Sequence, residues 1–233
     1  MNNEAVSDFV QRRNLPLVVF DSCALLDIPR LKYGPETLEV LNLCYKQGSD
    51  KFTYLLPNQV VREIGVNLSQ VALTSCHRLK DSLSLCQAIK LFEKGSLEVR
   101  IEQQLTTVND TIMDIVTQSV KLDDSDSYFC RAMNRMINRK KPSHPTKSSY
   151  GDCLILESIL DCSTRLRNDG FDKDIVFVTT NPDDFSANMQ ELKCAPHPDF
   201  AREFSSLRIV YLTDLRPLFY ETSLQKIKAT QNL

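Results

Sequence analysis

The sequence predicts an α/β protein whose mostly parallel β-sheet is covered by helices on both faces. Short apolar runs, such as residues 17–20 (LVVF), have the length and composition of buried strands. Longer stretches in which apolar residues recur at helical spacing separate these runs. Strands that alternate with helices favour parallel pairing, because a parallel neighbour requires a long crossover connection.

Strands and helices are predicted in this order along the chain. The strands are expected at 17–21, 52–56, 174–179 and 207–212, and the helices at 36–47, 58–69, 149–168 and 214–220. Residues 70–138 are expected to be mainly helical, with an alternating stretch at 97–101 that fits a short strand. Residues 139–149 contain two prolines and are predicted to form a loop.

The composition is that of an ordinary globular protein. The 233 residues fit one domain, or one domain with a large insertion, and they are 42% hydrophobic and 25% charged. The formal net charge is −2, so the protein as a whole does not attract polyanions. A polyanion would have to be held by a local basic patch or through metal ions. No apolar run is long enough to span a bilayer, and the N-terminus lacks the apolar core of a secretory signal. A cytoplasmic location without membrane attachment is therefore expected.

The eight cysteines are scattered along the chain without a C-x-x-C pair. A zinc knuckle or a redox motif needs closely spaced ligand pairs, so neither is predicted. Most of the cysteines lie inside apolar patterns, where a free thiol behaves as a small hydrophobic side chain.

Acidic residues follow or flank several predicted elements at what would be one edge of the sheet. Asp21 closes the first strand, and Asp184 follows the strand at 174–179 in the run Asn181-Pro182-Asp183-Asp184-Phe185. Glu63 lies on the flank of the buried stripe of the helix that begins after Pro57. The carboxyl ends of parallel strands are where open α/β sheets bind their ligands.

Asp152 is the fourth acid, and its helix offers two competitors. Ile155, Leu156 and other apolar residues cluster within a quarter turn of Asp152 around the helix axis. Asp152 therefore lies at the start of the buried face of the helix. Glu157 and Asp161 fall on the opposite side and are expected in solvent. The helical periodicity therefore selects Asp152.

Each acid by itself also has an ordinary structural explanation. Asp21 could cap a helix, Glu63 could pair with an arginine, Asp152 could be a helix N-terminal charge, and Asp184 could form a turn. Four carboxylates at one edge would repel one another and take up protons unless a cation neutralised them. The ion suited to oxygen ligands is hard and divalent, namely Mg²⁺ or Mn²⁺.

Four segments resemble, in order, the acidic motifs of the PIN domain family of nucleases. They are residues 18–26, 57–63, 151–156 and 178–185, and the similarity extends in this order over essentially the whole chain. The resemblance implies a three-layer α/β/α sandwich and metal-dependent cleavage of phosphodiester bonds, with RNA favoured and single-stranded DNA possible. Relative to compact family members the chain is one domain with a mainly helical insertion at about 70–147, which could form a lid, a substrate channel or a partner surface.

The resemblance also assigns residues to the site. Asp21, Glu63 and Asp152 carry over as metal ligands, while Ser22 and Thr179 match small hydroxyl positions beside them. The fourth position departs from the commonest pattern, because Asn181 stands where many members have aspartate. It is therefore assigned to Asp184, with Asn181 as a supporting ligand and Asp183 as the weaker candidate.

A basic stretch precedes the helix that carries Asp152, and it contains no acid. Its cations are expected to bind substrate phosphates, or else to form a solvated loop; the candidates are Arg139, Lys140, Lys141 and Lys147. Arg62 is a further candidate that could equally neutralise the acidic cluster.

Two other classes of protein fit the sequence less well than a nuclease does. A haloacid-dehalogenase-type phosphatase requires a second acid two positions after Asp21, where Cys23 stands. A receiver domain would leave Glu63 and Asp152 unexplained. A catalytically inactive PIN-like module remains open, serving as a scaffold in a toxin–antitoxin, defence or RNA-processing complex. An antitoxin, another protein partner or a second copy of the chain are possible partners.

Overall fold

The computed structural model describes residues 3–89, 97–146, 149–187 and 195–231, and its centre is a five-stranded parallel sheet. The strand order is β3-β2-β1-β4-β5, and every pairing is parallel. The strands are β1 (Leu17–Phe20), β2 (Thr53–Pro57), β3 (Val120–Leu122), β4 (Ile175–Val178) and β5 (Ile209–Leu212). The predicted parallel α/β fold with a helical elaboration is confirmed.

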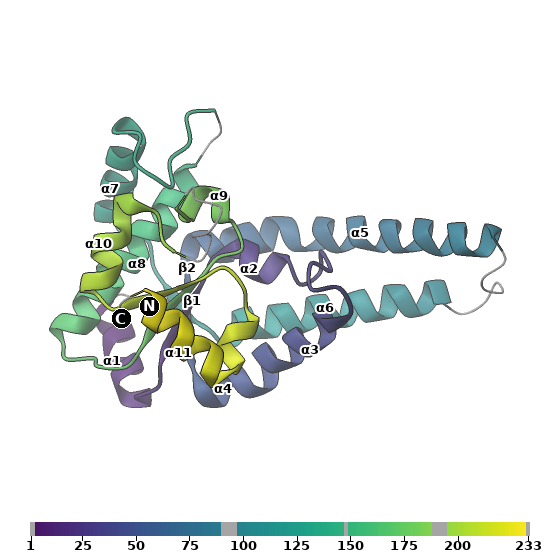
Figure 1. Ribbon diagram of the computed structural model, residues 1–233, viewed down its shortest axis with the longest axis horizontal. Coiled ribbons are helices and arrows are strands. Elements are labelled where there is room, and N and C mark those ends of the chain that lie inside the picture. Colours follow the sequence, from purple (N-terminus) through teal and green to yellow (C-terminus); the bar gives the residue numbers. More distant parts are fainter. Residues whose placement is uncertain (1–2, 90–96, 147–148, 188–194, 232–233) are drawn as a thin grey trace.

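Helices surround this sheet, and two of them extend far beyond it (Figure 1). The α-helices are α1 (Asn3–Arg13), α2 (Ser22–Leu26), α3 (Thr37–Asn42), α4 (Gly48–Lys51), α5 (Asn58–Ala88), α6 (Leu97–Gln118), α7 (Asp126–Ile137), α8 (Tyr150–Asn168), α9 (Pro182–Phe185), α10 (Pro198–Ser206) and α11 (Glu221–Thr230). Short turns of other helix types occur at η1 (Gly34–Glu36), η2 (Leu43–Gln47) and η3 (Arg216–Phe219). None of the helices within the described ranges is long and apolar enough to cross a membrane.

The order of the strands creates a switch point between β1 and β4. From β1 the chain builds β2 and β3 outward on one side, and then returns to add β4 and β5 on the other. Phe20 pairs with Val178, and the amide of Asp21 donates to the Val178 carbonyl at 2.9 Å. The residues that follow β1 and β4 therefore meet at the carboxyl edge, where the connections diverge and ligands bind in this class of sheet.

The central third of the chain differs from its prediction in two places. Residues 97–101 are the first turns of α6 rather than a strand, because Leu97, Ile101 and Leu105 continue one helical stripe. The three-residue strand β3 was not predicted, and it pairs with β2 at the edge of the sheet. The long helices α5 and α6 project side by side from the sheet (Figure 1). The 31 residues of α5 correspond to a length of about 45 Å.

An aromatic cluster holds the segment after β4 against the sheet. Phe185 is fully buried, and its ring lies 5.4 Å from that of Phe177 in β4. Phe200 of α10 also packs against Phe185, with ring centroids 6.3 Å apart. The short helix α9 is thereby fixed at the sheet edge, although it has only four residues.

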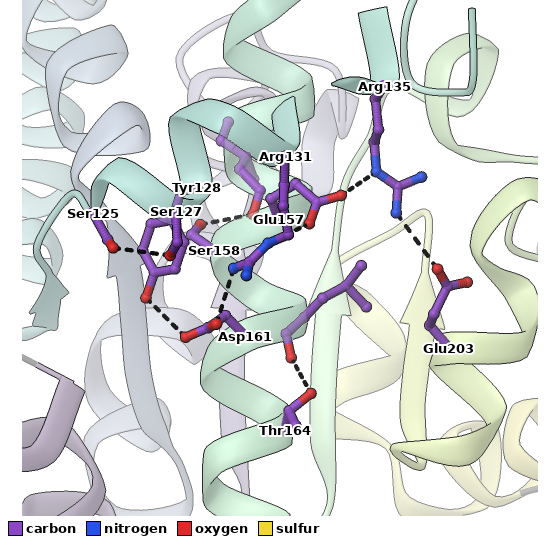
Figure 2. Close-up of polar contacts among 12 residues, drawn as sticks. Ser125, Ser127, Tyr128, Arg131, Arg135, Glu157, Ser158, Asp161, Thr164 and Glu203 are labelled. Carbon is purple, nitrogen blue, oxygen red and sulfur yellow. Dashed lines mark hydrogen bonds and ion pairs between the residues drawn. The ribbon is translucent and has the colours of Figure 1, made fainter. Parts of the chain in front are cut away.

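The predicted solvent exposure of Glu157 and Asp161 is wrong. Glu157 is buried and accepts hydrogen bonds from two arginines of α7, Arg131 at 3.0 Å and the buried Arg135 (Figure 2). Asp161 accepts from Arg131 at 2.9 Å (Figure 2). The reason is tertiary, since α7 packs along the face of α8 that the helical periodicity assigned to water.

Candidate active site

Asp21 lies at the end of β1 and is almost completely buried, with 1% of its surface exposed. The hydroxyl of Thr179 donates to its Oδ2 at 2.7 Å. Burial raises its pKa from 3.8 to about 6, the nearby charge of Glu63 adds to the rise, and the Thr179 hydrogen bond opposes it. Asp21 stands at the N-cap of α2, and the nearby main-chain N–H groups of Ser22 and Cys23 also lower its pKa, but its side chain forms no capping hydrogen bond.

Glu63 lies next to Asp21, although α5 and β1 are far apart in sequence. Its stripe neighbours Val60 and Ile64 are fully buried, which orients the flank of α5 toward the sheet edge. The Ser22 hydroxyl donates to Glu63 Oε2 at 2.5 Å and lies 3.5 Å from Asp21 Oδ1. One hydroxyl group therefore bridges the two carboxylates.

Asp152 directly follows Gly151 of α8, which lies close to the side chains of Glu63 and Gln59 of α5. A Cβ atom at Gly151 would lie 2.7 Å from Glu63 Oε1 and 3.0 Å from Gln59 Nε2. Only glycine fits there without moving its neighbours, and the next residue along α8 is Asp152. Burial raises the pKa of the Cys23 thiol to about 12, and the charges of Asp21 and Asp152 both contribute, which places Cys23 near these two acids.

The loop after β4 supplies an amide and an acid that are bonded to each other. The amide N–H of Asn181 donates to the Thr179 hydroxyl at 3.1 Å, and its side-chain Nδ2 donates to Asp184 Oδ2 at 2.6 Å. Asp184 is completely buried, Asn181 is partly exposed and Asp183 is exposed. Of the three candidates for the fourth position, Asn181 is thus partly open to solvent and Asp184 lies beneath it.

Hydrogen bonds join these residues into one network, but they do not form a preassembled metal cage. The network runs from Asp184 through Asn181 and Thr179 to Asp21, and then through Ser22 to Glu63. Within the described part of the chain, no group of three or more His, Cys, Asp or Glu side chains is arranged to hold a metal ion. The carboxylate oxygens of Glu63 instead accept from Ser22 and Gln59.

The cations selected from the sequence have different surroundings. Arg62 is half-exposed and pairs with Asp124 at 2.5 Å, so it does not pair with Glu63. Arg139 and Lys140 are exposed. Lys141 Nζ donates to the Asp183 carbonyl at 2.9 Å and therefore reaches the loop after β4. Lys147 lies outside the described residues.

Sequence reasoning overlooked two groups beside the site. Gln59 donates to Glu63 Oε1 at 2.7 Å, and its i, i+4 spacing from Glu63 on a predicted helix was the available signal. Lys32 donates to Asp27 Oδ2 at 2.6 Å and to the Thr180 carbonyl at 3.2 Å. No local pattern connects residue 32 with residue 180, because only the fold brings them together.

The fold and the site define a class of protein, namely a parallel α/β domain with buried acids at its switch point. The family model for the PIN domain matches residues 18–185, which include all four acids and Asn181. The chain belongs to the PIN domain family, whose fold is that of nucleases acting on nucleic acid. The searches of curated proteins and of solved structures returned no match.

Proposed function

We propose that this protein is a metal-dependent endonuclease that cleaves the phosphodiester backbone, with RNA as the favoured substrate. The observation that carries the proposal is the buried Asp21, hydrogen-bonded into a network with Glu63 and Asn181 at the switch point of a PIN fold. Elementary electrostatics supports it, because a fold that buries one carboxylate beside another bears a large cost unless a cation is bound. The preference for RNA comes from the family resemblance.

The donor set suits Mg²⁺ or Mn²⁺. The candidate ligands offer only oxygen atoms and carry several negative charges, as a hard divalent cation requires; they are Asp21, Glu63, Asp152, Asp184 and Asn181. When bound, such ions supply an activated water and polarise the scissile phosphate. No nucleophilic side chain is required.

The remaining residues orient these ligands. Thr179 and Ser22 hold the carboxylates of Asp21 and Glu63, and their hydroxyl protons can turn toward other acceptors when a cation is bound. Asp184 binds the NH₂ group of Asn181, which leaves the Asn181 carbonyl oxygen available as a ligand. In this arrangement Asp184 orients the Asn181 side chain toward the metal ion, in addition to any direct coordination of the ion by Asp184 itself.

The second candidate function is a PIN module without catalysis, which serves as a scaffold or binding partner. Two observations favour it. The Asn181–Asp184 hydrogen bond occupies one oxygen of the fourth acid, and the acids do not form a ready metal-binding group within the described residues. Such a module would act within a toxin–antitoxin, defence or RNA-processing complex.

Cleavage of labelled substrates tests the proposal. Single-stranded RNA, single-stranded DNA and duplexes are incubated with Mn²⁺ or with EDTA, using the parent, Asp21→Asn and the control Asp172→Asn. Asp172 is 74% exposed and precedes β4, at the opposite edge of the sheet. The expected result is cleavage of single-stranded RNA that requires Mn²⁺, is lost in Asp21→Asn and is kept in Asp172→Asn. Absence of cleavage under all conditions would favour the non-catalytic module.

A further inference from the structure

Two lysines from distant parts of the chain bind main-chain carbonyls of the loop after β4. Lys32 Nζ donates to the Thr180 carbonyl at 3.2 Å, and Lys141 Nζ donates to the Asp183 carbonyl at 2.9 Å. Asn181 lies between these two contacts along the chain. The two ammonium groups thus contact the loop after β4 on either side of Asn181 in the sequence.

Neither carbonyl contact neutralises its ammonium group, although the main-chain N–H of Lys141 also donates to the carboxylate of Asp199 at 2.7 Å. Asp27 is buried, and its single carboxylate is shared by Arg30 at 3.0 Å and Lys32 at 2.6 Å, so this group carries a net charge of about +1. The side chains of Arg30 and Lys32 remain 43% and 53% exposed. At Lys141 the acceptor is a neutral carbonyl, which orients the ammonium group without cancelling its charge.

Such cations address a difficulty that the acidic site itself creates. A phosphodiester approaching Asp21, Glu63 and Asp152 is repelled by their charge, and neighbouring exposed cations offset this repulsion. The acids are also recessed, with Asp21 only 1% exposed. A flexible single strand can bend one phosphate toward a recessed site more readily than a duplex can.

We infer that Lys32 and Arg30 on one side, and Lys141 on the other, bind backbone phosphates that flank the cleaved position of a single-stranded substrate. The strand then crosses the loop at residues 180–183. This inference rests on the proposed nuclease function and extends it, because Lys32 and Arg30 belong to no sequence motif of the site. The competing explanation is that Lys32 only clamps the loop.

Binding of a fluorescent single-stranded RNA oligonucleotide, measured in EDTA as salt is varied, tests the inference. Lys32→Gln and Lys141→Gln are each expected to weaken binding about three- to tenfold and to lower the salt slope by about 0.7. Lys32→Arg keeps the charge and is expected to bind as the parent does. The matched control is Lys80→Gln, since Lys80 also pairs with a carboxylate, that of Glu102, but lies about 25 Å along α5 from Glu63.

The outcomes separate the phosphate contacts from the nuclease function. Unchanged binding in both glutamine variants overturns the inference, and so does an equal loss in Lys80→Gln. A lowered melting temperature in Lys32→Gln without recovery of binding in Lys32→Arg establishes the clamp instead. With Mn²⁺, the glutamine variants are expected to raise KM more than they change kcat. A parent that binds RNA through Lys32 but never cleaves it would refute the nuclease and keep the phosphate contacts.

Discussion

Replacing Asp21 with asparagine removes a buried negative charge and nearly preserves the shape of the side chain. The pKa of Asp21 is raised from 3.8 to about 6, chiefly by burial, so the folded protein holds this proton more tightly than the unfolded chain does. The resulting stability is fully present below pH 3.8 and is lost as the pH rises through about 6. At 1.36 kcal/mol per pKa unit, the ionised carboxylate costs about 3 kcal/mol at pH 8.

In EDTA at pH 8, Asp21→Asn is therefore expected to be more stable than the parent by up to about 3 kcal/mol. For a chain of 233 residues this corresponds to a melting temperature higher by roughly 6–12 °C. The advantage should disappear below pH 4, where the parent is protonated. Differential scanning fluorimetry across this pH range, supported by urea denaturation, measures the effect.

Added Mn²⁺ should reverse the order of the two proteins. Binding to the folded state raises the melting temperature of the parent, whereas Asp21→Asn has lost a ligand and should respond little. Thr179→Val is a useful companion, because loss of its hydroxyl removes a contact that lowers the pKa of Asp21 and should extend the destabilisation to higher pH. A parent that is more stable than Asp21→Asn at pH 8 in EDTA would refute this reasoning, since its buried charge would then be compensated within the protein.

Two other predictions concern packing around the site. Glu157→Gln leaves the buried Arg135 with an uncharged partner, and it should lower the free energy of unfolding by about 3 kcal/mol, measured by urea denaturation. The double variant Arg135→Met, Glu157→Leu removes both charges and should lose less stability than Glu157→Gln. A larger loss of stability in the double variant would contradict this account. Gly151→Ala places a methyl group 2.7 Å from Glu63 Oε1 and should reduce RNA cleavage at least tenfold. Gly65→Ala is the control, because Gly65 lies two residues after Glu63 in α5 and an added methyl group there meets open space. This variant should retain cleavage and gain about 0.5–1 kcal/mol of stability. Equal cleavage rates in the two alanine variants would show that the close approach of Gly151 to Glu63 does not contribute to cleavage.

Much of the fold could be read from short segments of the sequence. The runs that became β1, β2, β4 and β5 are each buried along their whole length, and a buried parallel strand reads as a continuous apolar run. The short strand β3 escaped prediction because three residues between two helices carry too little periodicity. The alternation at 97–101 was misread because five residues fit a strand and a helix equally well.

For the site, the sequence determined which acids stand at strand and helix ends, because that information lies within a few neighbouring residues. Asp21 and Asp152 are predicted from such positions, and Glu63 from its place on the flank of the buried stripe of its helix. The tertiary structure decided which groups meet them: the Ser22 bridge, the contact of Asn181 with Asp184, and the approach of Lys32 to Thr180. It likewise directed Glu157 into an ion pair with α7 rather than into water. A periodic pattern specifies the face of an element that is apolar, whereas the partner of each polar face depends on packing between segments far apart in the chain.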